Sequence, residues 1–176
     1  MSFLKKCLLL GSILLLASCV STVPINYAPS SVLSANGTVK VESFSYLPAQ
    51  AGTVKSNQIR NTAMGNVFME KDVSTIVRDA VFAELRFVGV KVGTEGNVLT
   101  GEIQEFLIDD LGYSVDWTLR VRYLLRDESG NVIYDEVKSV ERKTNKFANA
   151  FGALNETIKL SAEEIIKDED FIRAVN

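Results

Sequence analysis

The stretch YSVDWTLRVRYLLR, residues 113–126, alternates between apolar and polar side chains along most of its length. The apolar residues at every second position are Val115, Trp117, Leu119, Val121, Tyr123 and Leu125, and the polar residues between them are Asp116, Thr118, Arg120 and Arg122. Because successive side chains of a β-strand point to opposite faces of the sheet, this pattern predicts a long strand. It also predicts a sheet that is covered on one face and exposed to water on the other.

Further strands are predicted on both sides of this stretch. The predicted strands are residues 37–46, 88–92, 97–108, 113–126 and 132–143. The last three are separated by short polar turns at residues 109–112 and 127–131, and the second turn, DESGN, is typical of a hairpin. The sequence therefore predicts an antiparallel meander of three strands.

Two amphipathic helices are predicted from apolar residues at helical spacing. The first follows Asp72, a favoured N-cap residue type, and the second runs from about Lys146 to Lys167. The apolar stripes consist of Val73, Ile76, Val77, Ala80, Val81 and Leu85 in the first helix and of Phe147, Phe151, Leu154, Ile158, Ala162 and Ile165 in the second. A short terminal turn is expected to begin with Asp168 as its cap.

These elements predict an α+β fold. We expect two layers, with a mainly antiparallel sheet of about four to five strands and two amphipathic helices on one face. Residues 47–71 show no sustained period and are expected to form a long irregular loop. Residues 37–176 are expected to make a single domain.

The amino-terminal residues 1–18 have the layout of a secretory signal peptide. Lys5 and Lys6 precede an apolar run that extends from Cys7 to Ala17. This run of about 11 residues is shorter than the roughly 20 that a helix needs to span a bilayer. We therefore expect a signal peptide and not a retained transmembrane anchor.

The end of that signal, Leu16-Ala17-Ser18-Cys19, resembles the lipobox of bacterial lipoproteins. The resemblance implies lipidation of the Cys19 thiol, cleavage before Cys19 and acylation of the new amino terminus. The alternative is an ordinary signal peptide with a chance cysteine. Val20 stands where an aspartate holds lipoproteins of enteric-type bacteria at the inner membrane, so the resemblance implies the outer membrane, with the domain facing the periplasm.

Residues 19–36 comprise Cys19 and a segment that we expect to be a flexible tether. The segment VSTVPINYAPSSVLSAN, residues 20–36, is rich in serine, proline and alanine and carries no charge. Such a composition is typical of a linker. The sequence therefore predicts a domain that stands off the membrane on this segment.

The composition argues against several classes of function. The chain has no histidine, and its two cysteines would leave with the signal or become lipidated, so we expect no metal site, no cofactor and no enzymatic activity. Asp109, Asp110, Asp116 and Glu105 are interpreted as solvated charges around a turn. Removing Lys5 and Lys6 leaves 17 basic and 22 acidic residues, a net of about −5, which argues against nucleic acid or a broad anionic lipid surface as a partner.

Two groups of residues are candidates for binding a partner. Adaptable amides, an arginine and a phenylalanine gather in the 55–71 region, namely Asn57, Gln58, Arg60, Asn61 and Phe68. The alternative is that this region is only a connection. Arg120 and Arg122 form a basic stripe on the exposed face of their strand, and the alternative there is cross-strand pairing with Glu102, Glu136 or Glu141.

Three further motifs accompany the lipobox and the uncharged segment. They are FVGV at residues 87–90, D-x-x-G-Y at residues 109–113 and DEDFI at residues 168–172. Together they resemble the YajG-type small outer-membrane lipoproteins. The resemblance covers most of the mature chain and implies location and fold, while no activity and no functional residue can be transferred.

A weaker resemblance is to the auxiliary lipoproteins of lipid-transport ABC systems. The leading hypothesis is a non-catalytic accessory or envelope-maintenance lipoprotein, anchored to the membrane by its lipid, that binds another envelope protein. The alternative is a component of a transport system that binds a lipid, glycolipid or other amphiphile between the helices and the sheet.

Overall fold

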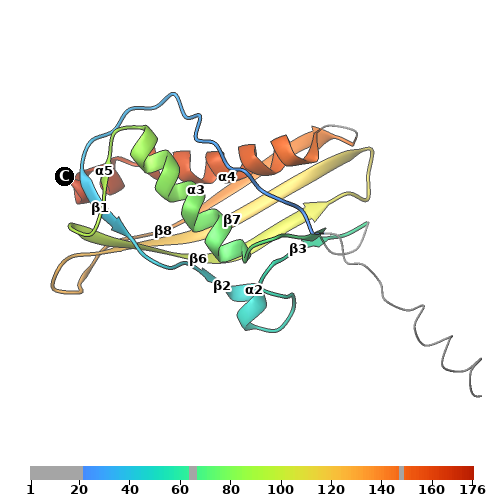
Figure 1. The fold of residues 1–176 in the computed structure, drawn as a ribbon, viewed down its shortest axis with the longest axis horizontal. Helices are drawn as coiled ribbons and strands as arrows, with labels where there is room; N and C mark the ends of the chain where they lie inside the picture. Colours follow the sequence, from blue (N-terminus) through green and yellow to red (C-terminus); the bar gives the residue numbers. More distant parts are fainter. Residues whose placement is uncertain (1–21, 64–66, 147–148) are drawn as a thin grey trace, which may run out of the picture.

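The computed structural model describes residues 22–63, 67–146 and 149–176. Within these ranges the chain forms eight strands in one mixed sheet and four helices, so the α+β class is confirmed (Figure 1). The signal peptide and Cys19 lie outside the described residues, as do Met64–Asn66 and Phe147–Ala148. Among the described residues, no helix combines the length and the hydropathy needed to cross a membrane.

The predicted meander is confirmed. It consists of β6 (Asn97–Asp109), β7 (Ser114–Arg126) and β8 (Val132–Asn145), paired antiparallel in that order. The six apolar residues of the β7 alternation are all buried. The turn between β7 and β8 contains Gly130 at a φ of 86°, a left-handed conformation that glycine adopts without strain.

The rest of the sheet differs from the prediction. Three short strands follow one another along β6 and pair with it in parallel: β1 (Thr38–Val41), β2 (Ser45–Tyr46) and β3 (Gln58–Asn61). Outside them, β5 (Lys91–Val92) pairs in parallel with β1, and β4 (Val67–Phe68) pairs antiparallel with β3. The expected mainly antiparallel sheet of four to five strands is therefore wrong in both size and strand direction.

The reason for the difference is the length of the outer strands. A strand of two to four residues is too short to show an alternating pattern, and its pairing is decided by contacts with β6. The predicted strand at residues 37–46 is split into β1 and β2. The region expected to be irregular contains α2 (Leu47–Gln50), β3 and β4.

Two long helices, α3 (Val73–Phe87) and α4 (Ala150–Ile166), cover the same face of the sheet (Figure 1). Asp72 occupies the N-cap position of α3 but makes no side-chain cap bond. The α4 helix starts later than predicted because β8 continues to Asn145, and Asn149 caps it by accepting from the N–H groups of Phe151 and Gly152. The terminal turn is α5 (Glu169–Val175), capped by Asp168 as expected.

The described part of the expected tether lies along the domain. From Thr22 to Ala35 every second side chain faces the protein, and the segment crosses the helices from the end near β3 to β1 (Figure 1). The N–H of Val23 donates to the carbonyl of Phe68 at 2.7 Å, and that of Ala35 donates to Val88 at 2.8 Å. Residues 22–35 are therefore docked, in contrast to the predicted flexible linker.

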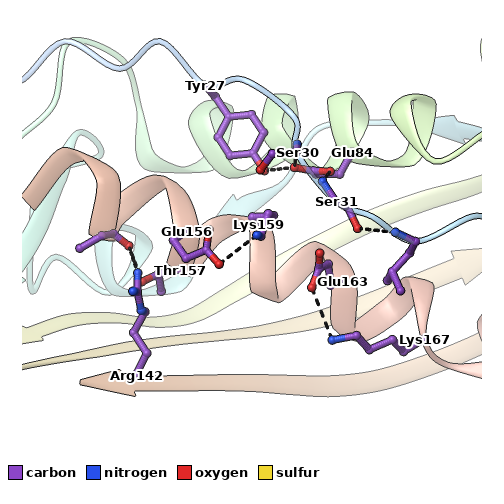
Figure 2. A network of polar contacts seen from close by, with 12 residues as sticks. Tyr27, Ser30, Ser31, Glu84, Arg142, Glu156, Thr157, Lys159, Glu163 and Lys167 are labelled. Carbon is purple, nitrogen blue, oxygen red and sulfur yellow. Dashed lines mark hydrogen bonds and ion pairs between the residues drawn. The ribbon is translucent and has the colours of Figure 1, made fainter. Parts of the chain in front are cut away.

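A buried carboxylate on α3 fastens this segment. Glu84 is fully inaccessible to solvent and accepts from the Tyr27 hydroxyl at 2.5 Å and from the N–H groups of Ser30 and Ser31 at 3.0 and 3.2 Å (Figure 2). Burial, and then the hydrogen bond to Glu84, raise the pKa of Tyr27, so its hydroxyl stays a neutral donor. Below α3, Glu156–Lys159 and Glu163–Lys167 form ion pairs on α4.

Candidate functional site

An apolar cavity of about 260 Å³ opens at one end of the sheet. Its walls come from Val23, Ile59, Asn61, Val67, Ile108, Asp110, Val115, Trp117, Thr144, Asn145, Lys146, Ala150, Phe151 and Leu154. The cavity therefore lies where the ends of β3, β6, β7 and β8 meet the start of α4 and the docked amino-terminal segment. Trp117 is held in the wall by a 2.9 Å hydrogen bond from its Nε1–H to the Thr144 hydroxyl.

One edge of the cavity is polar. Asp110 is buried, and the Nζ atom of Lys146 lies 3.2 Å from its Oδ1 atom and donates to the backbone carbonyls of Asp110 and Gly112. The ammonium group balances the charge of the carboxylate, but it makes no hydrogen bond to Oδ1. Among the described residues, Oδ1 of Asp110 is a buried acceptor without a hydrogen-bond donor. Asp110 and Lys146 thus form a closed, ion-paired polar corner of an otherwise largely apolar wall.

Exposed apolar side chains gather beside the cavity. Leu111 and Tyr113 in the turn between β6 and β7 are 72% and 103% exposed, and Phe151 in the first turn of α4 is 51% exposed. This end of the domain is opposite the carboxyl terminus (Figure 1). It is also the end at which Val23, near the start of the described chain, pairs with Met69.

The predicted partner-binding residues of the 55–71 region are divided between the interior and the surface. Gln58 and Asn61 are buried, and the Gln58 side chain accepts from the N–H of Lys55. Asn57 donates to the carbonyl of Met69, and Phe68 lies under the ammonium group of Lys55, so both support β3 and β4. Arg60 alone of the five is fully exposed.

Arg120 and Arg122 lie on the sheet face away from α3 and α4, and both are ion-paired. Arg120 pairs with Glu105 at 3.5 Å, and Arg122 pairs with Glu102 at 3.2 Å and Asp135 at 2.6 Å. The hydrogen bonds from Arg122, first that to Asp135 and then that to Glu102, raise the pKa of its guanidinium group. The basic stripe is thus largely neutralised by cross-strand pairing, one of the partners being the expected Glu102.

A second, more open cavity of about 440 Å³ brings Arg60 and Arg120 together. It lies between α2 and the outward side chains of β6 and β7, with Glu105 and Leu107 in its wall. Tyr46 is also in the wall, and burial raises the pKa of its hydroxyl to about 12. Two predicted site residues that are 60 positions apart in the sequence therefore share one groove.

The described residues contain no group of three histidine, cysteine, aspartate or glutamate side chains that could hold a metal ion. Asp109 accepts from the Thr62 hydroxyl at 2.7 Å and from the N–H of Leu111, and these bonds lower the pKa of its carboxyl group. Asp109 is thereby part of the turn structure. The arrangement offers an enclosed apolar space, which suits the binding of an apolar group.

Several residues that line the apolar cavity are not among the binding residues predicted from the sequence. They include Val23, Asp110, Lys146 and Phe151. The signal for Val23 was present, because Val23, Ile25 and Tyr27 alternate with polar or small residues as in an extended strand. No sequence signal joins Lys146 to Asp110. Their pairing depends on the packing of β8 beside β7 and of β7 beside β6.

No protein-family model matches this chain, and no curated protein matches it significantly. A Xanthomonas campestris protein of family DUF330 aligns with a TM-score of 0.64 and 13% identity, over 83% of this chain and 92% of its own. A hypothetical protein of Chlamydia trachomatis aligns with a TM-score of 0.56 and 10% identity, over 81% and 100%. A minor lipoprotein of Acinetobacter baumannii reaches a TM-score of 0.44 at 13% identity, over 78% and 94%, which is too low to establish a shared fold. At these identities the first two likenesses show a shared fold alone.

Proposed function

We propose that this protein is a lipid-anchored bacterial envelope lipoprotein that acts by binding, without catalysis, and holds the acyl chain of an amphiphile in its apolar cavity. The observation that carries the proposal is the cavity itself, which is lined mainly by apolar residues and has the half-exposed Phe151 in its wall. The match of residues 16–19 to a lipobox supports the anchor, and Val20 supports the outer membrane with the domain facing the periplasm.

The size and chemistry of the cavity suggest the class of ligand. Its volume of about 260 Å³ is slightly below the roughly 300 Å³ at which sites for small molecules usually begin, so it suits part of a single acyl chain. The wall is mainly apolar, and its two charged members, Asp110 and Lys146, pair with each other. The proposed ligand is therefore a single-chain or splayed lipid that inserts an acyl chain.

Trp117 makes this proposal directly testable, because it is the only tryptophan and it lines the cavity. The experiment uses a secreted form that begins at Val20 and so retains every described residue and the whole core. This form is titrated with lysophosphatidylethanolamine whose acyl chain carries bromine, below its micelle-forming concentration. We expect saturable quenching of tryptophan fluorescence, because bromine quenches only at close range.

The matched variants change one residue of the cavity wall. Ala150 is exposed at the first position of α4 and lines the cavity, so Ala150→Phe should occupy the space that the acyl chain needs. We expect this variant to lose the saturable quenching while Ala150→Ser retains it. Quenching that is linear in lipid concentration, or equal in both variants, would show that the cavity is not the acyl-chain site.

A second candidate function is the binding of another envelope protein. The groove shared by Arg60 and Arg120 favours it, because an exposed cation and the partly exposed Arg120–Glu105 ion pair lie beside the apolar residues of α2. Photocrosslinking probes placed in living cells at Arg60 and at Thr53, which also lines this groove, would be compared with a probe at Ser129 in the distant hairpin turn. Adducts with one protein at the first two positions only would support this function, and equal adducts at all three would refute it.

A further inference from the structure

The docked amino-terminal segment limits how far the domain can lie from its anchor. Val23 is held at the cavity end of the domain by its backbone bonds to Phe68 and Glu70. Only three residues separate it from Cys19, and a fully extended chain spans at most about 3.5 Å per Cα–Cα step, so these four steps keep Cys19 within about 14 Å of Val23. A lipid on Cys19 therefore brings this end of the domain close to the bilayer surface.

The side chains at that end suit contact with lipid. Leu111, Tyr113 and Phe151 are large apolar or amphipathic residues whose exposure no packing within the described domain explains. Aromatic residues are favoured at the boundary between head groups and acyl chains, where one part of the ring system is in apolar surroundings and another is hydrated.

We propose that the surface formed by Leu111, Tyr113 and Phe151 rests in the interfacial layer of the phospholipid membrane to which Cys19 is anchored. This inference rests on the proposed lipid anchor. It also places the apolar cavity next to the bilayer as a source of acyl chains, because Phe151 belongs both to this surface and to the cavity wall. The opposite end, with the β7–β8 turn and the carboxyl terminus, then points away from the membrane (Figure 1).

The contrast with the rest of the described surface supports this orientation. The other exposed large apolar residues are Val32, Phe87, Val132, Ile133 and Val137. Val132, Ile133 and Val137 belong to β8, whose outward face carries the ion-paired Asp135, and Phe87 is at the far end of α3. None of these five lines the cavity. The cavity end thus combines a short link to the anchor, exposed apolar side chains and an apolar opening.

The test uses the full lipidated protein in vesicles of phosphatidylethanolamine and phosphatidylglycerol. The mature chain has no cysteine besides Cys19, so a single new cysteine can be labelled with an environment-sensitive fluorophore. Gly112→Cys places the label between Leu111 and Tyr113, at an exposed position where a Cβ atom meets nothing closer than 3.9 Å. Ser129→Cys, in the turn between β7 and β8, is the matched control at the opposite end.

We expect the label at position 112 to shift to shorter emission wavelength and to be quenched by lipids that carry bromine on their acyl chains. The label at position 129 should keep the emission wavelength of a fluorophore in water, and the brominated lipids should not quench it. Replacing Leu111, Tyr113 and Phe151 together by serine should sharply reduce the quenching at position 112. If both labels remain in water although the anchor is present, the proposed membrane contact is wrong.

The mass of the purified protein, measured before reconstitution, separates this outcome from a failure of the proposed function. If the mass shows lipid on Cys19 but the label at position 112 remains in water, only the proposed membrane contact is contradicted. A protein without lipid on Cys19 contradicts the anchor on which the inference rests. The Ala150→Phe variant adds a third comparison, because it should lose acyl-chain binding and keep the membrane signal at position 112.

Discussion

At the scale of single residues, Glu84 shows how a buried charge can organise a structure. Burying a carboxylate is costly unless hydrogen bonds replace its water shell. Glu84 has three such bonds, all of them from the amino-terminal segment, so the segment and the carboxylate depend on each other. Without residues 27–31, Glu84 would lose every described donor. We therefore regard Glu84 as the residue that decides whether the segment is docked.

The variant Glu84→Gln tests this role. Its amide keeps the shape of the carboxylate but has only one acceptor oxygen, so at least one donor of the segment loses its partner. We expect unfolding free energy to fall by about 1–3 kcal/mol, the usual cost of an unsatisfied buried group. Amide hydrogen exchange at Ser30 and Ser31, measured by NMR, should become faster.

A control is available on the neighbouring helix. Glu164 pairs with Lys167 on the surface of α4, and Glu164→Gln should change stability by less than about 1 kcal/mol, as expected for an exposed pair. Exchange at Ser30 and Ser31 should remain slow in that variant. Unchanged exchange in Glu84→Gln itself would mean that the segment is held by its apolar contacts alone.

At the scale of elements, β8 is a 14-residue edge strand that pairs only with β7 among the described strands. Long free edges invite pairing with other chains, and inward-pointing charged residues oppose it. Lys138 and Arg142 point toward the helix layer, where Lys138 pairs with Asp168 and Arg142 donates to the carbonyl of Ala153. These charges both protect the edge and connect β8 to α4 and α5.

Asp168 joins β8 to α5. Its carboxylate accepts from Lys138 at 2.5 Å and from the Tyr134 hydroxyl at 2.9 Å, both on β8, and it caps α5 through the N–H of Asp170. Partial burial by itself would raise the pKa of Asp168, but these hydrogen bonds outweigh it and lower the pKa below 3.8. The carboxylate therefore stabilises the fold above about pH 4, and this contribution is lost as the pH falls through the lowered pKa.

The variant Asp168→Asn should lose this contribution. We expect a stability loss of about 1–3 kcal/mol at pH 7, because the charged hydrogen bond to Lys138 disappears while the cap can remain. The difference from the wild type should shrink as the pH is lowered toward 3, since the wild-type carboxylate then takes up a proton. Thermal unfolding between pH 3 and pH 7 measures both effects.

The control for this prediction is Asp170→Asn on the same helix. Asp170 pairs with Arg173, and both side chains are more than 70% exposed, so little change in stability is expected at any pH. A difference between wild type and Asp168→Asn that stays constant from pH 7 to pH 3 would contradict the assigned role of the carboxylate.

At the scale of the whole molecule, the amino-terminal segment is part of the folded domain. Val23, Ile25, Tyr27 and Leu33 pack against the core, and Ala35 belongs to it. A form that begins at Gly37 should therefore be less stable than one that begins at Val20, by on the order of 3–6 kcal/mol from lost apolar burial. Loss of the donors to Glu84 acts in the same direction.

Urea unfolding of the two forms measures this difference, and a form that begins at Thr22 is the control. The control retains every described contact, so its midpoint should match that of the form that begins at Val20. If the form that begins at Gly37 unfolds at the same urea concentration, the docked segment contributes nothing to stability.

Several features of the fold could be read from the sequence because each has a local physical cause. Alternation along residues 113–126 requires a strand with one buried face, and helical spacing after Asp72 requires an amphipathic helix. The helix–strand boundary at Gly89 has a φ of 109°, which favours glycine. These elements appear in the structure within a few residues of their predicted bounds.

The cavity and the composite edge of the sheet could not be read in this way. Phe44, for example, packs so closely on β6 that its ring occupies the place of a Cβ atom at Gly101, and no local pattern relates these two residues. Likewise the burial of Gln58 and Asn61 follows from the pairing of β3 with β6. The sequence alone favours a surface position for these two amide side chains, because the strand that buries them, β6, is distant in the sequence.

The sequence by itself determined the meander, the two helices covering it and the motif at Cys19, because periodicity and short motifs act over a few neighbouring residues. Only the tertiary structure decided that β1, β2 and β3 line up in parallel along β6 and that residues 22–35 are docked. It also decided that Asp110, Lys146 and Phe151 meet beside one apolar cavity. These features depend on contacts between segments that are far apart in the chain, where burial and hydrogen bonding outweigh local preference.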